Sequence, residues 1–331
     1  MGRIKQAADI WLSFSYSKLK SLFNCPFQFQ CQYVLKKPRP KPIILAVGSA
    51  LHYLAHLNNK RLYQSAESFG KAWLGFWAGV VSGKHGPDSF RAPPEPIGWK
   101  SANEAGYWFQ QGRKILEEYY RRHQDWRASL DQSITIALKS EYRLTGVSWE
   151  GFRLNGIIDR LDEYPDGVDI VDLKMGKDDL AVVSSSFQPL FYQIGYERRC
   201  RNKFCSGKPL RGFVIENLIT GEIQRIPTSG ADRLAEFTRY LREASDYIRA
   251  ILTQDQTLVR RLIHLHPQDV ENFRFFPRLP RNLHCKNCAY TADCLAWESD
   301  HGPPPRILWI DRFIAASEQP QPHQPDLPFG P

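Results

Sequence analysis

Two aspartates and a lysine near the middle of the chain have the residue types and spacing of a metal-dependent hydrolytic site. Asp159 ends the apolar segment 156–159, and Asp172 and Lys174 lie two positions apart in the segment 168–174. In an extended strand, residues two apart point to the same side of the sheet. Two carboxylates can hold a divalent cation, and a neighbouring lysine can stabilise negative charge on a phosphate. These three residues are therefore candidates for metal-dependent phosphodiester cleavage.

A predicted β-hairpin would bring the two aspartates together. Pro165-Asp166-Gly167 is a turn signal between two β-rich segments. If the turn centres on Pro165 and Asp166, residue 164 pairs with 167, and Asp159 lies opposite Asp172. Directly opposed residues have Cβ atoms ~4.5–5.5 Å apart, close enough to share one cation. The alternative is a surface Asp–Asp–Lys network, but the apolar residues around Asp172 favour a central strand, where unpartnered carboxylates are costly.

Four further polar residues could complete this site. His52 follows Gly48 by four positions on a predicted helix, and Glu141 begins a predicted strand. Gln188 and Tyr192 are four positions apart, which places them on one face of a helix. Each of these residues, taken alone, also fits a packing or surface role.

Cysteines at the two ends of the chain form a second constellation. Cys285, Cys288 and Cys294 have the spacing C-x2-C-x5-C, and Cys25 precedes a proline far upstream. Four thiolates can bind a [4Fe–4S] cluster or a structural Zn²⁺, and the spacing leaves both open. Either centre would join the two ends of the chain. The remaining cysteines are expected to be small buried residues: Cys31, Cys200 and Cys205.

Composition is that of an ordinary globular protein with a positive charge. The 331 residues include 44 Lys and Arg against 35 Asp and Glu, a formal charge of +9. This excess favours a polyanionic partner. No apolar run reaches the ~18 residues of a membrane helix, and residues 1–10 lack a signal pattern. These features predict a cytoplasmic protein that does not associate with a membrane.

The pattern of elements predicts a mixed α/β or α+β fold with helical flanks. Turn signals fall at Gly146 and at residues 165–167, and a Pro-rich tail, 301–331, is expected to be partly disordered. Helices are predicted at 15–35, from 46, and at 66–80, 104–123, 187–200 and 230–253. Strands are predicted at 133–145, 151–163, 168–174, 211–218 and 222–227.

The ordered motifs resemble the RecB-like branch of the PD-(D/E)xK nuclease superfamily. The resemblance is closest to iron–sulfur members, such as the CRISPR-associated RecB-like exonucleases and the nuclease domain of the AddB helicase-nuclease subunit. It extends from Ser15 to about Trp297. The motifs are Ser17-x7-Cys25-Pro26, Gly48-x3-His52, Gly156-Ile157-Ile158-Asp159-Arg160, Asp172-Leu173-Lys174, Gln188-x3-Tyr192 and the terminal cysteines.

The resemblance implies a role for each candidate residue. His52, Asp159 and Asp172 would be metal ligands and Lys174 the catalytic lysine, whereas Glu141 matches the upstream acidic position less closely. Gln188 and Tyr192 would lie beside the active site and the DNA strand. The four [4Fe–4S] ligands would be Cys25, Cys285, Cys288 and Cys294, which favours iron–sulfur over zinc.

The implied fold is a restriction-endonuclease-like core, with a central mixed sheet flanked by helices, a helical insert and a C-terminal Fe–S cap. Residues 1–300 would form one nuclease domain, with the insert at about 60–130 and the cysteine region at 285–294. The implied activity is Mg²⁺- or Mn²⁺-dependent exonuclease cleavage of single-stranded DNA or frayed ends, in repair, recombination or CRISPR-type processing. A helicase or a CRISPR-adaptation protein could be a partner, since the chain has no P-loop motif. The alternative is a catalytically silent DNA-binding or scaffold subunit.

Overall fold

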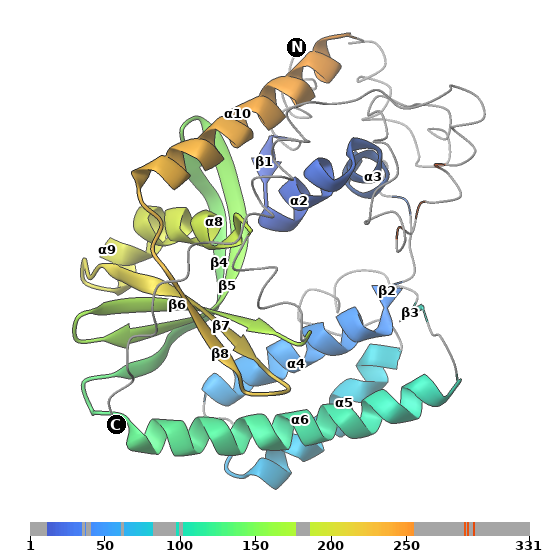
Figure 1. The fold of residues 1–331 in the computed structure, drawn as a ribbon. Helices are drawn as coiled ribbons and strands as arrows, with labels where there is room; N and C mark the ends of the chain where they lie inside the picture. The colour runs from blue at the N-terminus through green and yellow to red at the C-terminus, as the bar shows by residue number, and fades with distance from the viewer. Residues whose placement is uncertain are drawn as a thin grey trace.

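The computed structural model describes residues 12–34, 37, 41–60, 63–81, 97–98, 102–176, 186–254, 288, 290 and 294. Within these residues, a six-stranded mixed sheet lies between two groups of helices (Figure 1). This arrangement agrees with the predicted restriction-endonuclease-like fold. The predicted C-terminal cap and the tail 301–331 fall almost entirely outside the described residues. The predicted division into one domain and a tail stays a prediction.

The central sheet has the strand order β1-β5-β6-β7-β8. The sixth strand, β4, lies outside this order and also pairs with β5. The β1–β5 and β6–β7 pairs are parallel, and the other pairs are antiparallel. Strand β6 lies between β5 and β7 and is buried along almost its whole length, as expected for a central strand. The strands are β1 (Ser13–Phe14), β4 (Thr135–Trp149), β5 (Phe152–Tyr164), β6 (Gly167–Lys174), β7 (Leu210–Asn217) and β8 (Ile223–Pro227). A small second sheet pairs β2 (Lys41–Pro42) with β3 (Ile97–Gly98).

The helices follow the predicted order. They are α2 (Tyr16–Asn24), α3 (Pro26–Phe29), α4 (Ile43–Asn59), α5 (Ala66–Val81), α6 (Ala102–Ser129), α8 (Gln188–Gly195), α9 (Arg201–Phe204) and α10 (Ala231–Gln254). Two π-helical segments, η1 (Gln30–Val34) and η2 (Tyr196–Cys200), extend α3 and α8. Helix α2 starts as predicted, because the Ser15 hydroxyl accepts a hydrogen bond from the amide of Lys18 at 3.2 Å.

Two local predictions need correction. The predicted helix 15–35 is interrupted at Cys25, whose backbone is extended (φ −169°, ψ 117°), because a following proline disfavours helical backbone. The turn predicted at Gly146 is instead an irregularity inside β4, which continues to Trp149. Gly146 has φ +58°, a conformation that glycine adopts without strain and that accommodates a bulge in a strand. The chain turns later, at residues 150–151.

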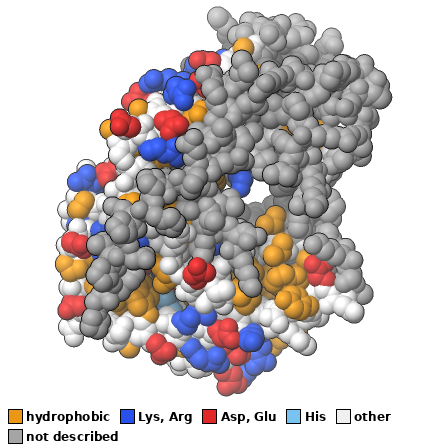
Figure 2. All heavy atoms as spheres, viewed as in Figure 1, with side chains coloured by type: hydrophobic (Ala, Val, Ile, Leu, Met, Phe, Trp, Pro, Cys, Tyr) orange, Lys and Arg blue, Asp and Glu red, His pale blue; other side chains and the backbone are white. Residues whose placement is uncertain are grey.

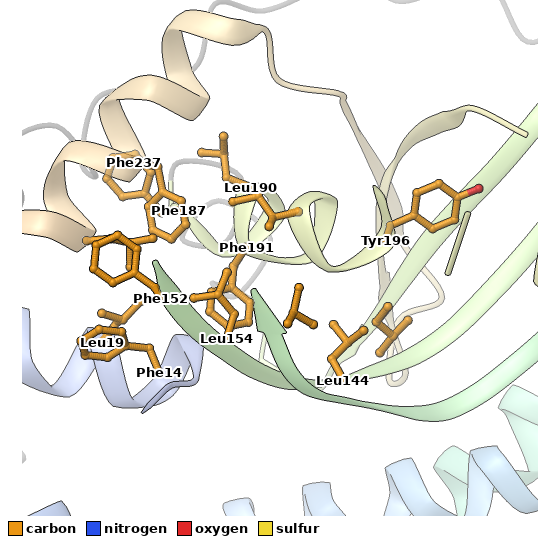
Figure 3. Close-up of a cluster of buried hydrophobic side chains, with 14 of the residues drawn as sticks. Phe14, Leu19, Leu144, Phe152, Leu154, Phe187, Leu190, Phe191, Tyr196 and Phe237 are labelled. Carbon is orange, nitrogen blue, oxygen red and sulfur yellow. The ribbon is translucent and has the colours of Figure 1, made fainter. Parts of the chain in front are cut away.

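Each face of the sheet has its own hydrophobic core. One core packs α2, α8 and α10 against the sheet, and Figure 3 shows its side chains gathered between α8 and strands β4 and β5. The other core packs α4, α5 and α6 against the opposite face. Strand β6 serves both, because Val168 and Ile170 enter the first core whereas Val171 and Leu173 enter the second. The same alternation places Asp172 on the α8 face.

Charges of both signs cover the outer helices. Figure 2 shows Lys and Arg side chains mixed with Asp and Glu over α6 and α10. Examples are the Arg113–Glu117 pair at 2.8 Å and the Arg233–Glu236 pair at 2.6 Å. The charge of these surfaces is therefore mixed rather than mainly positive or mainly negative. Exposed ion pairs of this kind stabilise the fold only slightly. No described helix is both long and apolar enough to cross a membrane.

A buried arginine connects the sheet to α6. The Arg160 guanidinium lies 3.0 Å from the carboxylate of Asp162 and 2.9 Å from that of Glu216. It also donates to the Tyr119 hydroxyl at 3.4 Å. A buried ion is tolerated only when it is paired in this way. The network fixes α6 over β5 and β7.

His123 lies beside this network in an unusual environment. Its ring stacks on Tyr119 at a centroid distance of 5.2 Å, and the residue is only 3% exposed. Among the residues that the structure describes, neither ring nitrogen has a hydrogen-bond partner. Burial, together with the positive charges of Arg160 and Arg127, lowers the pKa of His123 to about 2. The folded protein therefore keeps this imidazole neutral.

This environment predicts that His123 reduces stability in mild acid. Below a pH of about 6.5, the unfolded chain binds a proton on His123 that the folded chain does not, so stability falls by up to about 1.4 kcal/mol per pH unit. His123→Phe should remove this contribution. Urea unfolding at pH 7, 6 and 5 measures the free energy of unfolding. Between pH 7 and pH 5 it should fall by about 2 kcal/mol more in the wild type than in His123→Phe. Tyr119→Phe is the control, because it keeps the stacked ring. Equal pH dependence in wild type and His123→Phe would contradict the prediction.

Candidate active site

The predicted hairpin brings the aspartates of β5 and β6 together. Tyr164 pairs with Gly167, so the turn centres on Pro165 and Asp166 as predicted. The same register continues to Arg160 opposite Val171, where the strand pairs end, one residue before Asp159 and Asp172. Beyond that point, the Asp159 carboxylate accepts a hydrogen bond from the amide of Leu173 at 2.8 Å. The Asp159 side chain thus bonds to the β6 backbone where the backbone pairing of the two strands ends.

Asp172 is held by two neighbours. One carboxylate oxygen lies 2.6 Å from Lys174 Nζ, as expected for residues two apart on one strand. The other accepts a hydrogen bond from Gln188 Nε2 at 3.0 Å. Gln188 begins α8, and Pro189 occupies the first turn, where a missing amide hydrogen costs nothing. Helix α8 therefore orients Asp172 from one face of the sheet.

His52 reaches the same site from the opposite face. Helix α4 passes close to the end of β6 at Gly48, where an added Cβ would lie 3.3 Å from Met175 Sδ. One turn later, His52 Nδ1 lies 3.4 Å from Asp159 Oδ2. The glycine therefore permits the approach that brings the imidazole to the carboxylate.

Glu141 completes a possible metal site. Ser140 pairs with Arg160 and Tyr142 with Ile158, so Glu141 lies opposite Asp159 across the β4–β5 pair. One ligand atom each from His52, Glu141 and Asp159 can be chosen so that all lie within 4.8 Å of one another; no other such His, Cys, Asp or Glu group occurs in the described part of the chain. Asp172 is adjacent, but it is not a member of this group.

The backbone of Glu141 is strained. Its φ of +49° is rare for a residue with a side chain and costs about 1–3 kcal/mol. Strain of this kind persists where surrounding structure imposes it, and it is concentrated at functional sites. The sequence pattern matched Glu141 less closely than the other candidates, and a left-handed residue within a strand has no sequence signature. The fold nevertheless places this carboxylate beside Asp159.

Burial and neighbouring charges raise the pKa of Asp172 and His52 and lower that of Asp159. Burial raises the pKa of Asp172 to about 6; Lys174 opposes this shift and the charge of Asp159 adds to it. Burial would also raise the pKa of Asp159, but its interactions with His52 and Lys174 outweigh burial and lower it. The pKa of His52 is raised, because Asp159 outweighs the effect of burial. Acidic groups thus concentrate in a poorly hydrated site, which a divalent cation would stabilise.

The donor set fits Mg²⁺ or Mn²⁺. Carboxylate oxygens suit both cations, and an imidazole nitrogen is acceptable to Mn²⁺. His52, Glu141 and Asp159 would hold the ion. The predicted ligand role of Asp172 and the predicted DNA contacts of Gln188 and Tyr192 stay predictions. In the structure Gln188 supports Asp172, and the Tyr192 ring stacks on Phe213 at a centroid distance of 5.9 Å.

Three of the four clustered cysteines gather in one place. Cys25, Cys288 and Cys294 pack against a small buried group formed by Phe27, Cys31 and Tyr290. The amide of Cys294 donates to the Tyr290 carbonyl at 2.9 Å. The Sγ atoms of these three cysteines do not all lie within 4.8 Å of one another. The fourth cysteine, Cys285, lies outside the described residues. The predicted cluster is therefore not shown. Cys31 was not expected beside these cysteines.

The remaining two cysteines agree with the prediction. Cys200 and Cys205 are fully buried, and both lie in the core on the α8 face. Burial raises the pKa of Cys200 to about 12, so this thiol stays protonated.

The metal site predicts that Glu141 contributes directly to cation affinity. Loss of a supporting group around a metal costs ~10–100-fold in affinity, so loss of a ligand should cost at least about tenfold. Titration calorimetry with Mn²⁺ should show this weakening for Glu141→Gln. The matched control is Glu150→Gln, since Glu150 also has a positive φ, +47°, but lies in the turn between β4 and β5 and pairs with Arg242 at the surface. Equal Mn²⁺ affinity in Glu141→Gln and wild type would rule out this ligand.

Comparison with known proteins gives one assignment. No curated protein matches the chain. The family model of the PD-(D/E)XK nuclease superfamily matches residues 13–295, a span from β1 through the whole candidate site to Cys294. The order of the site residues and the mixed sheet agree with this match. The chain therefore belongs to the PD-(D/E)XK nuclease superfamily, a group of metal-dependent enzymes that cleave phosphodiester bonds.

Proposed function

We propose that this protein is a metal-dependent deoxyribonuclease that acts on single-stranded DNA or frayed DNA ends. The observation that carries the proposal is the convergence of His52, Glu141 and Asp159 within 4.8 Å, beside the Asp172–Lys174 ion pair at 2.6 Å. The family match supports phosphodiester cleavage. The net charge of +9 supports a polyanionic substrate.

Each residue of the site has a separate task. A bound Mg²⁺ or Mn²⁺ would act as a Lewis acid on the scissile phosphate. Lys174, whose side chain is 21% exposed, can reach a phosphate oxygen and stabilise its developing charge. Asp172 holds the Lys174 ammonium in place, and Gln188 holds Asp172. Exonuclease action would require the free end of a strand to enter beside these groups.

This arrangement predicts that Lys174→Met abolishes most cleavage and leaves Mn²⁺ binding unchanged. Removing one group that stabilises transition-state charge typically costs ~10²–10³ in kcat. Degradation of end-labelled single-stranded DNA measures the effect. Lys208→Met is the matched control, because Lys208 also forms an ion pair with a carboxylate, that of Glu163 at 3.0 Å, away from the site. Full activity of Lys174→Met would refute the proposed role.

The second candidate function is a catalytically silent DNA-binding or scaffold subunit. Asp172 already forms an ion pair with Lys174 and accepts a hydrogen bond from Gln188. Its carboxylate is therefore satisfied without a substrate, which favours a subunit that does not cleave. The same assay separates the two candidates. A wild-type protein that binds DNA but does not cleave linear or circular DNA with Mn²⁺ would support the scaffold function.

We further propose that the protein belongs to the RecB-like iron–sulfur branch, with a [4Fe–4S] cluster on Cys25, Cys285, Cys288 and Cys294. The support is the packing of Cys25 around the same small group as Cys288 and Cys294, which are far from it in sequence. A cluster there would close a long loop and stabilise the fold. Structural Zn²⁺ is the alternative. A helicase or CRISPR-adaptation protein that supplies strand ends would be the corresponding partner.

The cluster proposal predicts a brown protein with about four iron atoms per chain after anaerobic purification. Cys25→Ser should lose the visible absorbance and lower the melting temperature. Cys205→Ser is the control, because Cys205 is buried in the core on the α8 face. A colourless wild type with stoichiometric zinc would overturn the iron–sulfur assignment.

A further inference from the structure

A pocket of about 360 Å³ lies at the edge of the sheet, where η2 and α9 pass over β4. Within the described sheet, β4 pairs only with β5, so its other side is open. The pocket is lined by Tyr142, Arg143, Thr145, Glu197, Arg198, Arg199, Asn202 and Lys203. None of these residues belongs to the candidate metal site.

The pocket has a strong positive charge. Four of its lining residues are cationic and one is acidic. The acidic residue, Glu197, forms an ion pair at 2.9 Å with Arg201, which lies outside the lining. The pocket therefore differs from α6 and α10, where cations form ion pairs with carboxylates of the same helix.

Three of the pocket's cations, Arg198, Arg199 and Lys203, are positioned by aromatic rings and a carbonyl. The Arg198 guanidinium lies over the Trp149 ring, 5.1 Å from its centroid. Arg199 donates to the carbonyl of Gly146 at 3.2 Å, and Lys203 Nζ lies 5.1 Å from the centroid of the Phe204 ring. Aromatic faces and carbonyls order a side chain but leave its positive charge available. Such groups are suited to an anionic ligand.

The pocket and the candidate metal site share strand β4. Tyr142 lines the pocket and directly follows Glu141, the candidate ligand on β4. Arg143 is two residues from Glu141, or ~7 Å along an extended strand. One or two nucleotides span such a distance, since a duplex strand advances ~3.4 Å per nucleotide.

We infer that this pocket binds a backbone phosphate of the nucleic acid strand, one or two nucleotides from the bond that is cleaved. Arginine recognises phosphate through two parallel hydrogen bonds, and two arginines of the pocket, Arg198 and Arg199, are adjacent in sequence. The ring of Tyr142, which packs edge-to-face on Phe204 at 5.0 Å, provides an apolar side of the pocket for a sugar or base. The inference rests on the proposed function. The pocket would set the affinity for the strand and its register over the metal site, and it would take no part in bond cleavage.

The test is a double variant, Arg198→Ala with Lys203→Ala, both exposed residues. Fluorescence anisotropy with a labelled single-stranded oligonucleotide, in metal-free buffer, measures binding without cleavage. The Kd should rise at least about tenfold, and the slope of log K against log salt should decrease by ~0.7 for each lost phosphate contact. With Mn²⁺ present, KM should rise while kcat stays within about twofold of wild type.

The matched control is Arg239→Ala with Arg249→Ala, two exposed cations of α10 that form ion pairs within their own helix. It should leave the Kd and salt slope unchanged, and circular dichroism should show all proteins folded. An unchanged Kd and salt slope in the test variant would overturn the inference, as would a wild type that does not bind DNA. Weaker binding to polyglutamate with unchanged binding to DNA would also overturn it, and would assign the pocket to an acidic protein partner. If the wild type binds DNA through this pocket but does not cleave it, the nuclease proposal fails and the pocket assignment stands.

Discussion

The cost of placing carboxylates side by side in a poorly hydrated site is the constraint on which the rest of the structure depends. Asp159 and Asp172 lie directly beyond the last pair of strands β5 and β6, Arg160 opposite Val171. Neither could remain ionised there without partners. The partners come from three directions: Lys174 from the same strand, Gln188 from α8 and His52 from α4. Because α8 and α4 belong to different cores, both helical layers must pack correctly before the site exists.

The sheet carries two clusters of charged side chains, the network around Arg160 and the candidate active site, and they differ in their exposure to solvent. Arg160 and Asp162 have side chains that are 3% and 2% exposed, and the guanidinium is also paired with Glu216. That network is closed to solvent and stabilises the packing of α6. The side chains of His52 and Lys174 are 25% and 21% exposed, so a ligand can reach them. Accessibility, rather than the number of charges, distinguishes the candidate active site.

Strand β4 connects the features that bear on function. One of its strained residues, Glu141, places a carboxylate in the candidate metal site, and the next residues along the strand line the basic pocket. Further along, the irregularity at Gly146 presents the carbonyl that holds Arg199. A regular edge strand would offer neither the carboxylate in this position nor that carbonyl contact. Deviations from ideal strand geometry thus build both sites.

The sequence by itself determined the order of elements, the register of the β5–β6 hairpin and the pairing of Asp172 with Lys174. These follow from local rules, since a two-residue turn and the alternation of a strand fix which side chains meet. Only the tertiary structure decided the positive φ of Glu141, the bulge at Gly146, the engagement of Asp172 by Gln188 and the place of Cys31 beside the clustered cysteines. Each of these depends on contacts between segments distant in sequence. Such contacts are set by packing, which no spacing of residues along the chain specifies.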